Sequence, residues 1–306
     1  HPSGGETENE PMTSHPASTL QHVAIGRPIT KKGVSVFPVY RPGAAAHPLG
    51  LCRPNGGFIV REKATPTVPI LEVENLNDEP VVLFAGETLE GGRQQRVLNQ
   101  SVIIAGRTIT DIPVSCVEQG RWHGAHQFRG VGAMAPPEVR RSANRGDQME
   151  VWNSVSRVLG DHHLESPTMA LDEFFQRRGE TVDQAVVDEV ASWGPLPEQN
   201  GIVVMNRGRV VSADVFGDTE LLASMWGTLV ASAFSAAGEG RVSSTTNRAD
   251  KALSFLRRFA RDVRGPAGRS DFGLGEWRQV MSDRLTGQAL ALDGCLVHAS
   301  AFPTSV

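Results

Sequence analysis

The pattern of apolar and polar positions divides the chain into a strand-like part and a part rich in helices. From His22 to His126, short β-branched runs are bounded by glycine, proline or asparagine, a pattern typical of strands. Several short strands at close spacing favour an antiparallel β-sandwich or a partly closed barrel. The predicted strands are Val34–Tyr40, Gly57–Glu62, Thr67–Asn75, Pro80–Gly86, Gln95–Ile104 and Asp111–Glu118.

After Pro137 the apolar residues recur at helical spacing, as in the stripe from Met149 to Leu159. Two β-branched runs flank the turn Asn206–Arg209, and a last strand pair is predicted around Asp293–Gly294. Helices are predicted at residues 146–160, Ser166–Gly179, Thr181–Trp193, Asp218–Ala237 and Ala249–Val263.

These elements predict an α+β protein in which an N-terminal antiparallel β-sandwich precedes a helical segment and an α+β C-terminal part. Residues 1–20 are rich in Gly, Pro, Ser, Thr and Glu, which is typical of a flexible tail. We expect the sandwich at residues 21–135, the helical segment at 136–200, and the α+β part at 201–306, packed on the first.

The charge balance argues against a nucleic-acid or membrane-surface binder. The 306 residues carry 30 Lys and Arg against 34 Asp and Glu, a formal net charge of −4. No apolar run approaches the roughly 18 residues that a membrane helix needs. Three widely spaced cysteines form no disulfide framework, so we expect a cytoplasmic protein. The oligomeric state stays open.

The most polar of the strand-like stretches runs from Gly86 to Trp122. If its strands pair across the turn Ala105–Thr108, Val97 faces Cys116 and Gln95 faces Glu118. A one-residue slip would put Arg96 opposite Glu118 instead. In either register an arginine, a glutamine and Glu118 meet at the open end of the hairpin. A loop at residues 86–92 would bring Glu87 and Glu90 there, and residues 120–122 would add Arg121 and Trp122.

This polar corner has the groups that an anionic ligand needs. Arg93, Arg96 and Arg121 offer bidentate donors for phosphate. Gly91 and Gly92 allow close backbone approach. The three acids (Glu87, Glu90 and Glu118) could hold ribose hydroxyls or a divalent metal, or divide acid and base duties, and Trp122 could stack on a base. The alternative is a cluster of salt bridges that only closes the end of the sandwich.

Two stretches of this corner, GETLEGGRQQRVLNQS and IPVSCVEQGRW, resemble a bacterial family named for its association with ADP-ribosylglycohydrolases and rhodanese-phosphatase proteins. Its second half resembles GDTELLASMWGTLVASAFSAA and HASAF, so the resemblance covers the chain from about Gln21 onward. The name implies NAD or ADP-ribose metabolism. The motif positions transfer to Glu87, Glu90, Gly91, Gly92, Gln94, Arg96, Cys116, Glu118, Arg121 and Trp122.

Together these features predict a hydrolase acting on a phosphorylated ribose compound, such as ADP-ribose or an NAD derivative. The alternative is a non-catalytic binding or sensor module for such a ligand. Cys116 could be a packed side chain or a thiolate at the corner. His298 could return to the corner as an acid or base. His123 and His126 could bind zinc or be exposed loop residues. Cofactors stay unknown.

Overall fold

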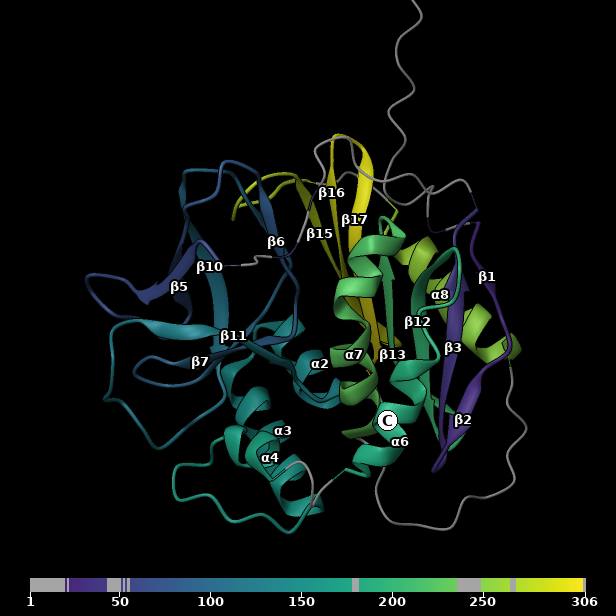
Figure 1. Cartoon of the computed structure of the whole chain (residues 1–306), viewed down its shortest axis with the longest axis horizontal. Coiled ribbons are helices and arrows are strands. Elements are labelled where there is room, and N and C mark those ends of the chain that lie inside the picture. The colour runs from purple at the N-terminus through teal and green to yellow at the C-terminus, as the bar shows by residue number, and fades with distance from the viewer. Residues whose placement is uncertain are drawn as a thin grey trace, which may run out of the picture.

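The computed structural model of this chain describes residues 20, 22–42, 51, 53, 56–177, 182–235, 249–264 and 268–304. The predicted tail, except for Leu20, therefore lies outside the described residues. The described part is a mixed fold of helices and antiparallel sheets (Figure 1). None of its helices is long and apolar enough to cross a membrane.

The larger sheet joins strands from both ends of the chain. Its order is β1-β3-β12-β13-β17-β16-β15-β14, and β2 pairs with the other part of β3. All its pairs are antiparallel. The strands are β1 (Ala24–Ile25), β2 (Ile29–Lys31), β3 (Val34–Tyr40), β12 (Gln199–Asn206), β13 (Arg209–Phe216), β14 (Gly268–Arg269), β15 (Glu276–Met281), β16 (Leu285–Leu292) and β17 (Cys295–Pro303).

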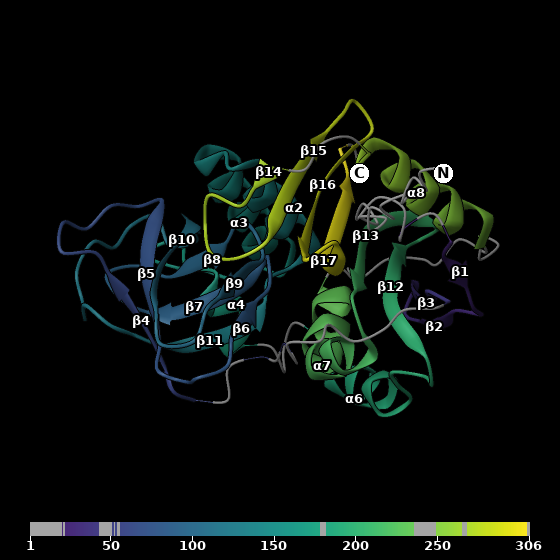
Figure 2. The ribbon, with the colours of Figure 1, turned by 90° about the horizontal axis from the view of Figure 1, so that it is seen from above.

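Helices cover both faces of this sheet, which explains why its central strands read as continuous apolar runs. On β12, Ile202 and Val204 join the core under α6 (Gln184–Ser192) and α7 (Thr219–Ser235). Val203 and Met205 join the core under α8 (Ala249–Asp262) on the other face. Figures 1 and 2 show α7 and α8 on opposite sides of the strands.

The second sheet curls into a nearly closed barrel, in the order β11-β7-β8-β10-β5-β4. Its edge strands meet through a bridge between Arg61 and Gln127, and the Glu62 N–H donates to the His126 carbonyl at 2.9 Å. A separate ladder pairs β6 (Val81–Leu83) with β9 (Val102–Ile104). The six barrel strands are β4 (Phe58–Glu62), β5 (Ile70–Asn75), β7 (Glu87–Gly91), β8 (Arg96–Leu98), β10 (Ile109–Cys116) and β11 (Phe128–Met134).

Three helices follow the barrel: α2 (Pro137–Arg145), α3 (Gln148–Asp161) and α4 (Asp172–Gln176). Helix α2 contacts β8 of the barrel and β13, β16 and β17 of the large sheet, so it lies at their junction. Within the described residues the helices all lie from Pro137 onward, as predicted, although α2 itself was not among the predicted helices. A mixed α and β fold with antiparallel sheets is confirmed, whereas a β-sandwich is not: the barrel strands form one curled sheet. The predicted division into domains stays a prediction.

The predicted N-terminal strand Val34–Tyr40 is confirmed, but it pairs with β12 of the C-terminal half rather than with the barrel. The predicted turns are also confirmed. Asn206 pairs with Arg209 and Leu292 pairs with Cys295, so each hairpin has a two-residue turn. Both turns place their two residues at positive φ, as the turn type requires.

The register predicted for the polar hairpin is wrong, and so is its one-residue alternative. Val97 faces Ser115 and Arg96 faces Cys116. The ladder covers only the open half of the hairpin, because β9 pairs with β6 and the first half of β10 pairs with β5. The segment at residues 86–92, predicted as a loop, contains strand β7.

The helix predicted at Ser166–Gly179 is reduced to α4, as far as the described residues extend. Residues before α4 instead pair with the chain after β10. The Gly120 N–H donates to the Thr168 carbonyl at 2.9 Å, and Ala170 bridges Glu118. These tertiary hydrogen bonds satisfy the backbone that a helix would otherwise use, so they override the local helical pattern.

Candidate functional site

Three chain segments meet at one end of the barrel. Strand β7 ends at Gly91, and Gly91 and Gly92 both have positive φ, 98° and 61°. A Cβ on Gly92 would lie 2.3 Å from the Phe128 ring, so only glycine fits this turn. The chain leaving β10 reaches Glu118, and the segment before α4 packs against it through Thr168.

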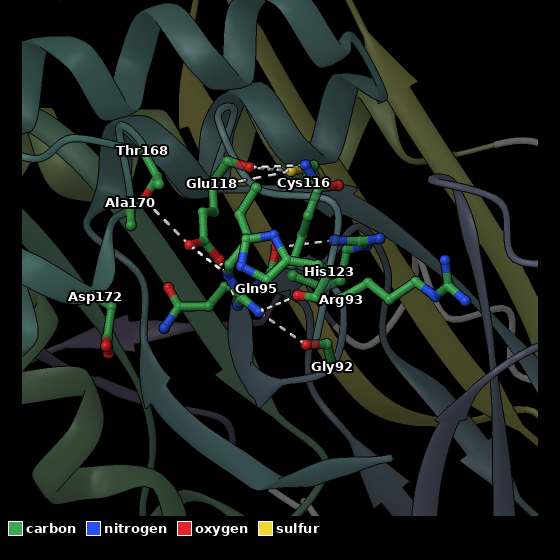
Figure 3. Close-up of polar contacts among 12 residues, drawn as sticks. Gly92, Arg93, Gln95, Cys116, Glu118, His123, Thr168, Ala170 and Asp172 are labelled. Atoms are coloured by element: carbon green, nitrogen blue, oxygen red, sulfur yellow. Dashed lines mark hydrogen bonds and ion pairs between the residues drawn. The ribbon is translucent and has the colours of Figure 1, made fainter. Parts of the chain in front are cut away.

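Glu118 is the centre of this meeting point and accepts four hydrogen bonds (Figure 3). Its Oε1 accepts from Arg121 Nε at 2.7 Å and from Thr168 Oγ1 at 3.2 Å. Its Oε2 accepts from Arg121 Nη2 at 2.6 Å and from the Gln95 N–H at 3.1 Å. Burial alone would raise the pKa of Glu118, but the bonds from Arg121 and Gln95 outweigh it and lower the pKa.

Most N–H groups of the Arg121 guanidinium donate hydrogen bonds to other groups of the protein. Besides the two bonds to Glu118, its Nη1 donates to the Gly92 carbonyl at 3.0 Å and to the His123 carbonyl at 2.8 Å. The hydrogen bond to Glu118 raises the pKa of Arg121. Arg121 therefore ties the β7 turn to the chain after β10, and little of its guanidinium is left for a ligand.

A cleft of about 470 Å³ opens beside this ion pair. That volume is within the range of small-molecule sites. In Figure 3, Thr168, Ala170 and Asp172 lie on one side of Glu118, and Gly92 and Arg93 lie on the other. The lining residues are Gly91, Gly92, Gln95, Glu118, Arg121, Gly124, Ala125, Gln127, Arg129, Thr168, Ala170, Asp172 and Glu173.

The charges of the cleft come from three carboxylates and two guanidiniums. Because Glu118 and Arg121 neutralise each other, the charges left for a ligand are those of Arg129, Asp172 and Glu173. Arg129 on β11 is exposed and has no ion-pair or hydrogen-bond partner among the described residues. Asp172 accepts a bond from Gln176 of its own helix.

Two of the predicted catalytic acids do not line the cleft. Glu87 begins β7, where it is buried, pairs with Arg53 and accepts from the Phe84 N–H at 2.6 Å. Burial raises the pKa of Glu87 against the opposing effect of Arg53. Glu90 lies on β7 opposite Gly130. The structure therefore brings Glu118 to the cleft without Glu87 or Glu90.

Four of the predicted ligand-binding residues also lie outside the cleft lining. Arg96 is fully buried, with its Nη2 3.7 Å from Glu62 Oε1. Trp122 is 44% exposed and lies over two guanidiniums, 5.8 Å from that of Arg96 and 5.9 Å from that of Arg93. The Gln94 side chain donates to the Glu118 carbonyl at 2.9 Å. These residues build the barrel end behind the cleft.

The other candidates have separate surroundings. Cys116 is buried, its thiol donates to the Glu118 carbonyl at 3.1 Å, and burial raises its pKa. The packed alternative for Cys116 is thus confirmed. His123 and His126 are exposed, and no group of three potential metal ligands occurs in the described part of the chain. His298 lies away from the corner, in contact with Ser101 and Asp214.

The sequence predicted that Gln95 and Glu118 lie together. It did not predict that Arg129, Asp172 and Glu173 belong to the same site. Arg129 follows the corner by seven residues and sits on a strand that the β-branched pattern did not predict. Asp172 and Glu173 lie in a segment read as an ordinary helix. No local signal distinguishes these three charged residues from solvated surface positions.

Residues 22–302 match the family model described as the ARG and Rhodanese-Phosphatase-superfamily-associated Protein domain, ARPP-1. The chain belongs to this family. No curated protein and no solved structure matches the chain significantly. The resemblance read from the sequence motifs is thereby confirmed, from the first strand of the large sheet almost to the end of its β17.

Within this ARPP-1 domain, four of the ten motif residues line the cleft and six do not. Gly91, Gly92, Glu118 and Arg121 face the cleft. The remaining positions, Glu87, Glu90, Gln94, Arg96, Cys116 and Trp122, support the barrel end from other sides. The glycines and the Glu118–Arg121 pair thus shape the cleft, while its free charges come from residues outside the motif.

Proposed function

We propose that the cleft binds a small phosphorylated ribose compound, such as ADP-ribose or an NAD derivative. The observation that carries this proposal is the position of Arg129, whose guanidinium has no partner among the described residues and lines a cleft of about 470 Å³. A guanidinium offers paired donors to a phosphate. Gly91 and Gly92 line the same cleft, so a ligand bound there lies beside their backbone.

The acidic side of the cleft narrows the ligand class. The charges of Glu118 and Arg121 cancel each other. The remaining charged groups in the cleft lining are one guanidinium, that of Arg129, and two carboxylates, those of Asp172 and Glu173. A bare polyphosphate would meet repulsion there, because like charges disfavour one another. A ligand with a phosphate at one end and hydroxyls at the other can use both signs. The Gln95 and Gln127 side chains add neutral donors and acceptors.

In this proposal Glu118 positions Arg121 and the cleft wall instead of acting as a base. Its four hydrogen bonds occupy the lone pairs that a base needs. We therefore favour a non-catalytic binding or sensor role over hydrolysis. Hydrolysis is the second candidate, and the two less constrained carboxylates of Asp172 and Glu173 favour it, because an acid and a base could be drawn from them. A cytoplasmic location remains a prediction.

Removing the Arg129 side chain is expected to weaken ADP-ribose binding by about 1.5–3 kcal/mol, the range for a hydrogen bond to a charged group. Isothermal titration calorimetry of wild type and Arg129→Ala measures this loss. Circular dichroism should be unchanged, since Arg129 is exposed and has no partner in the described part of the chain.

Arg209→Ala provides the matched control, because Arg209 is also an exposed strand arginine but lies on β13, outside the cleft lining. It should bind like wild type. A wild-type protein that binds none of ADP-ribose, NAD and ribose 5-phosphate would refute the proposal. Chromatography of the incubated ligand separates the two roles: intact ligand supports binding alone, and ligand cleavage lost in Asp172→Asn or Glu173→Gln supports hydrolysis.

A further inference from the structure

A second polar constellation is buried between the barrel and the large sheet, away from the cleft. Ser101 lies in the connection between β8 and β9, His298 lies on β17, and Asp214 lies on β13. All three are at most 1% exposed. Ser101 Oγ is 2.7 Å from His298 Nδ1, and His298 Nε2 is 3.4 Å from Asp214 Oδ1. A hydroxyl, an imidazole and a carboxylate therefore contact one another in that order.

The contacts of Asp214 and His298 indicate which atoms of these groups carry protons. Asp214 accepts two hydrogen bonds from the Arg140 guanidinium, and its pKa falls to about 2 although burial opposes the charge. A charged Asp214 can only accept, so the 3.4 Å contact with His298 Nε2 favours the tautomer with the proton on Nε2 and the lone pair on Nδ1. That lone pair accepts a hydrogen bond from the Ser101 hydroxyl. Burial lowers the pKa of His298, which keeps the imidazole neutral and able to act as a base.

Aromatic rings and backbone hydrogen bonds shield the His298 imidazole from solvent and hold Ser101 beside it. The rings of Phe84 and Phe216 flank His298, with centroids 5.0 and 4.8 Å away. The backbone N–H of Ala85 donates to Ser101 Oγ at 3.0 Å. The Ser101 N–H donates to Gln288 Oε1 at 3.0 Å, which fixes the serine backbone from the large sheet. A core that only had to pack could fill this place with apolar side chains at lower desolvation cost.

The geometry points to Ser101 as a nucleophile for acyl transfer from a small carboxylic ester, with His298 as its general base. Asp214 is a positioning residue, because it touches only the imidazole among the reacting groups. This is the nucleophile, base and orienting-group arrangement of serine hydrolases, with the two imidazole nitrogens exchanged. The proposal is independent of the ligand proposed for the cleft.

The reaction balances without any further reactant than water. Ser101 Oγ bonds to the acyl carbon and the bond from that carbon to the alcohol oxygen breaks. The hydroxyl proton moves to His298 Nδ1 and then to the leaving alcohol. Water next attacks the acyl carbon and gives one proton to His298 Nδ1. The bond from that carbon to Ser101 Oγ then breaks and His298 returns the proton to Oγ, which releases the carboxylic acid and restores free Ser101 and the neutral imidazole. Because Ser101 is fully buried, the junction between barrel and sheet must open to admit the ester.

The test is covalent labelling with phenylmethanesulfonyl fluoride, followed by intact mass and peptide mapping of the full chain. One sulfonyl group is expected on Ser101, with fluoride as the leaving group. Ser101→Ala should lose the adduct. Ser154→Ala is the matched control, because Ser154 is equally buried but hydrogen-bonds Ser142, and it should keep the adduct. Acetate release from 4-nitrophenyl acetate should likewise be abolished by Ser101→Ala and kept by Ser154→Ala.

General-base catalysis contributes about 100-fold or more, so His298→Gln should slow labelling by at least that factor. Should this variant not fold, the pH dependence of wild-type labelling replaces it. The rate should fall as acid protonates His298 and should level off near neutral pH. Wild-type protein that stays unlabelled while a known serine hydrolase reacts, or labelling that is spread over several serines, would overturn the proposal.

Discussion

Replacing Arg140 with methionine is expected to lower the free energy of unfolding by about 3–5 kcal/mol, the cost of breaking a buried ion pair from one side. Arg140 and Asp214 are 2% and 0% exposed, and two hydrogen bonds join them. Without the guanidinium, the Asp214 carboxylate stays in the core, and its remaining polar contact among the described residues is His298. Urea unfolding followed by circular dichroism measures the loss.

Two companion variants make this result specific. Arg145→Met changes an arginine of the same helix whose pair with Glu150 is partly exposed, so it should cost less than about 1 kcal/mol. Adding Asp214→Asn to Arg140→Met removes the orphaned charge and should recover part of the loss. If Arg140→Met costs no more than Arg145→Met, the buried pair does not hold the junction together.

Acid should weaken the same pair. The folded-state pKa of Asp214, about 2, is lower than its ordinary value of 3.8. The carboxylate therefore stabilises the fold above pH 3.8, and this contribution is lost as the pH falls toward 2. The Arg140–Asp214 pair joins α2 to β13, so its loss loosens the place where α2 contacts both sheets.

Five strands of the large sheet (β3, β12, β13, β16 and β17) and the turns between them could be predicted because their signals are local, whereas β1, β2, β14 and β15 were not predicted. β3 and β12 are continuous apolar runs, and the two-residue turns carry Arg207–Gly208 and Asp293–Gly294. The order of the strands in the sheet could not be predicted in the same way. β3 pairs with β12 across more than 150 residues, and no periodicity within either strand contains that information.

The candidate site could be predicted only where its residues belong to the same hairpin. Gln95 and Glu118 join because β8 and β10 are one ladder. Glu87 could not join them: it is four residues before Gly91 on an extended strand, which at about 3.3 Å per residue separates their backbones by roughly 13 Å. Arg129, Asp172 and Glu173 arrive by tertiary packing of β11 and α4, which leaves no mark in the local sequence.

Replacing Glu118 with glutamine is expected to lower the free energy of unfolding by about 2–4 kcal/mol, because leaving a buried donor or charge unpaired costs about 1–3 kcal/mol each. Glu118 accepts from four donors, and an amide nitrogen cannot accept. The donors on one of its oxygens, and with them part of the Arg121 charge, lose their acceptor. Chemical unfolding at neutral pH measures the loss.

The pH dependence of this loss identifies its cause. The pKa of Glu118 is lowered in the folded protein, so its carboxylate stabilises the fold above the ordinary glutamate range and loses this effect as the pH falls through the folded value. Wild type and Glu118→Gln should therefore converge in stability in acid. Glu90→Gln changes an acid outside the cleft lining and should cost less than about 0.5 kcal/mol. If Glu118→Gln instead kept full stability and cut hydrolysis of a ribose phosphate compound by about 100-fold, Glu118 would be the general base and the positioning role assigned to it would be wrong.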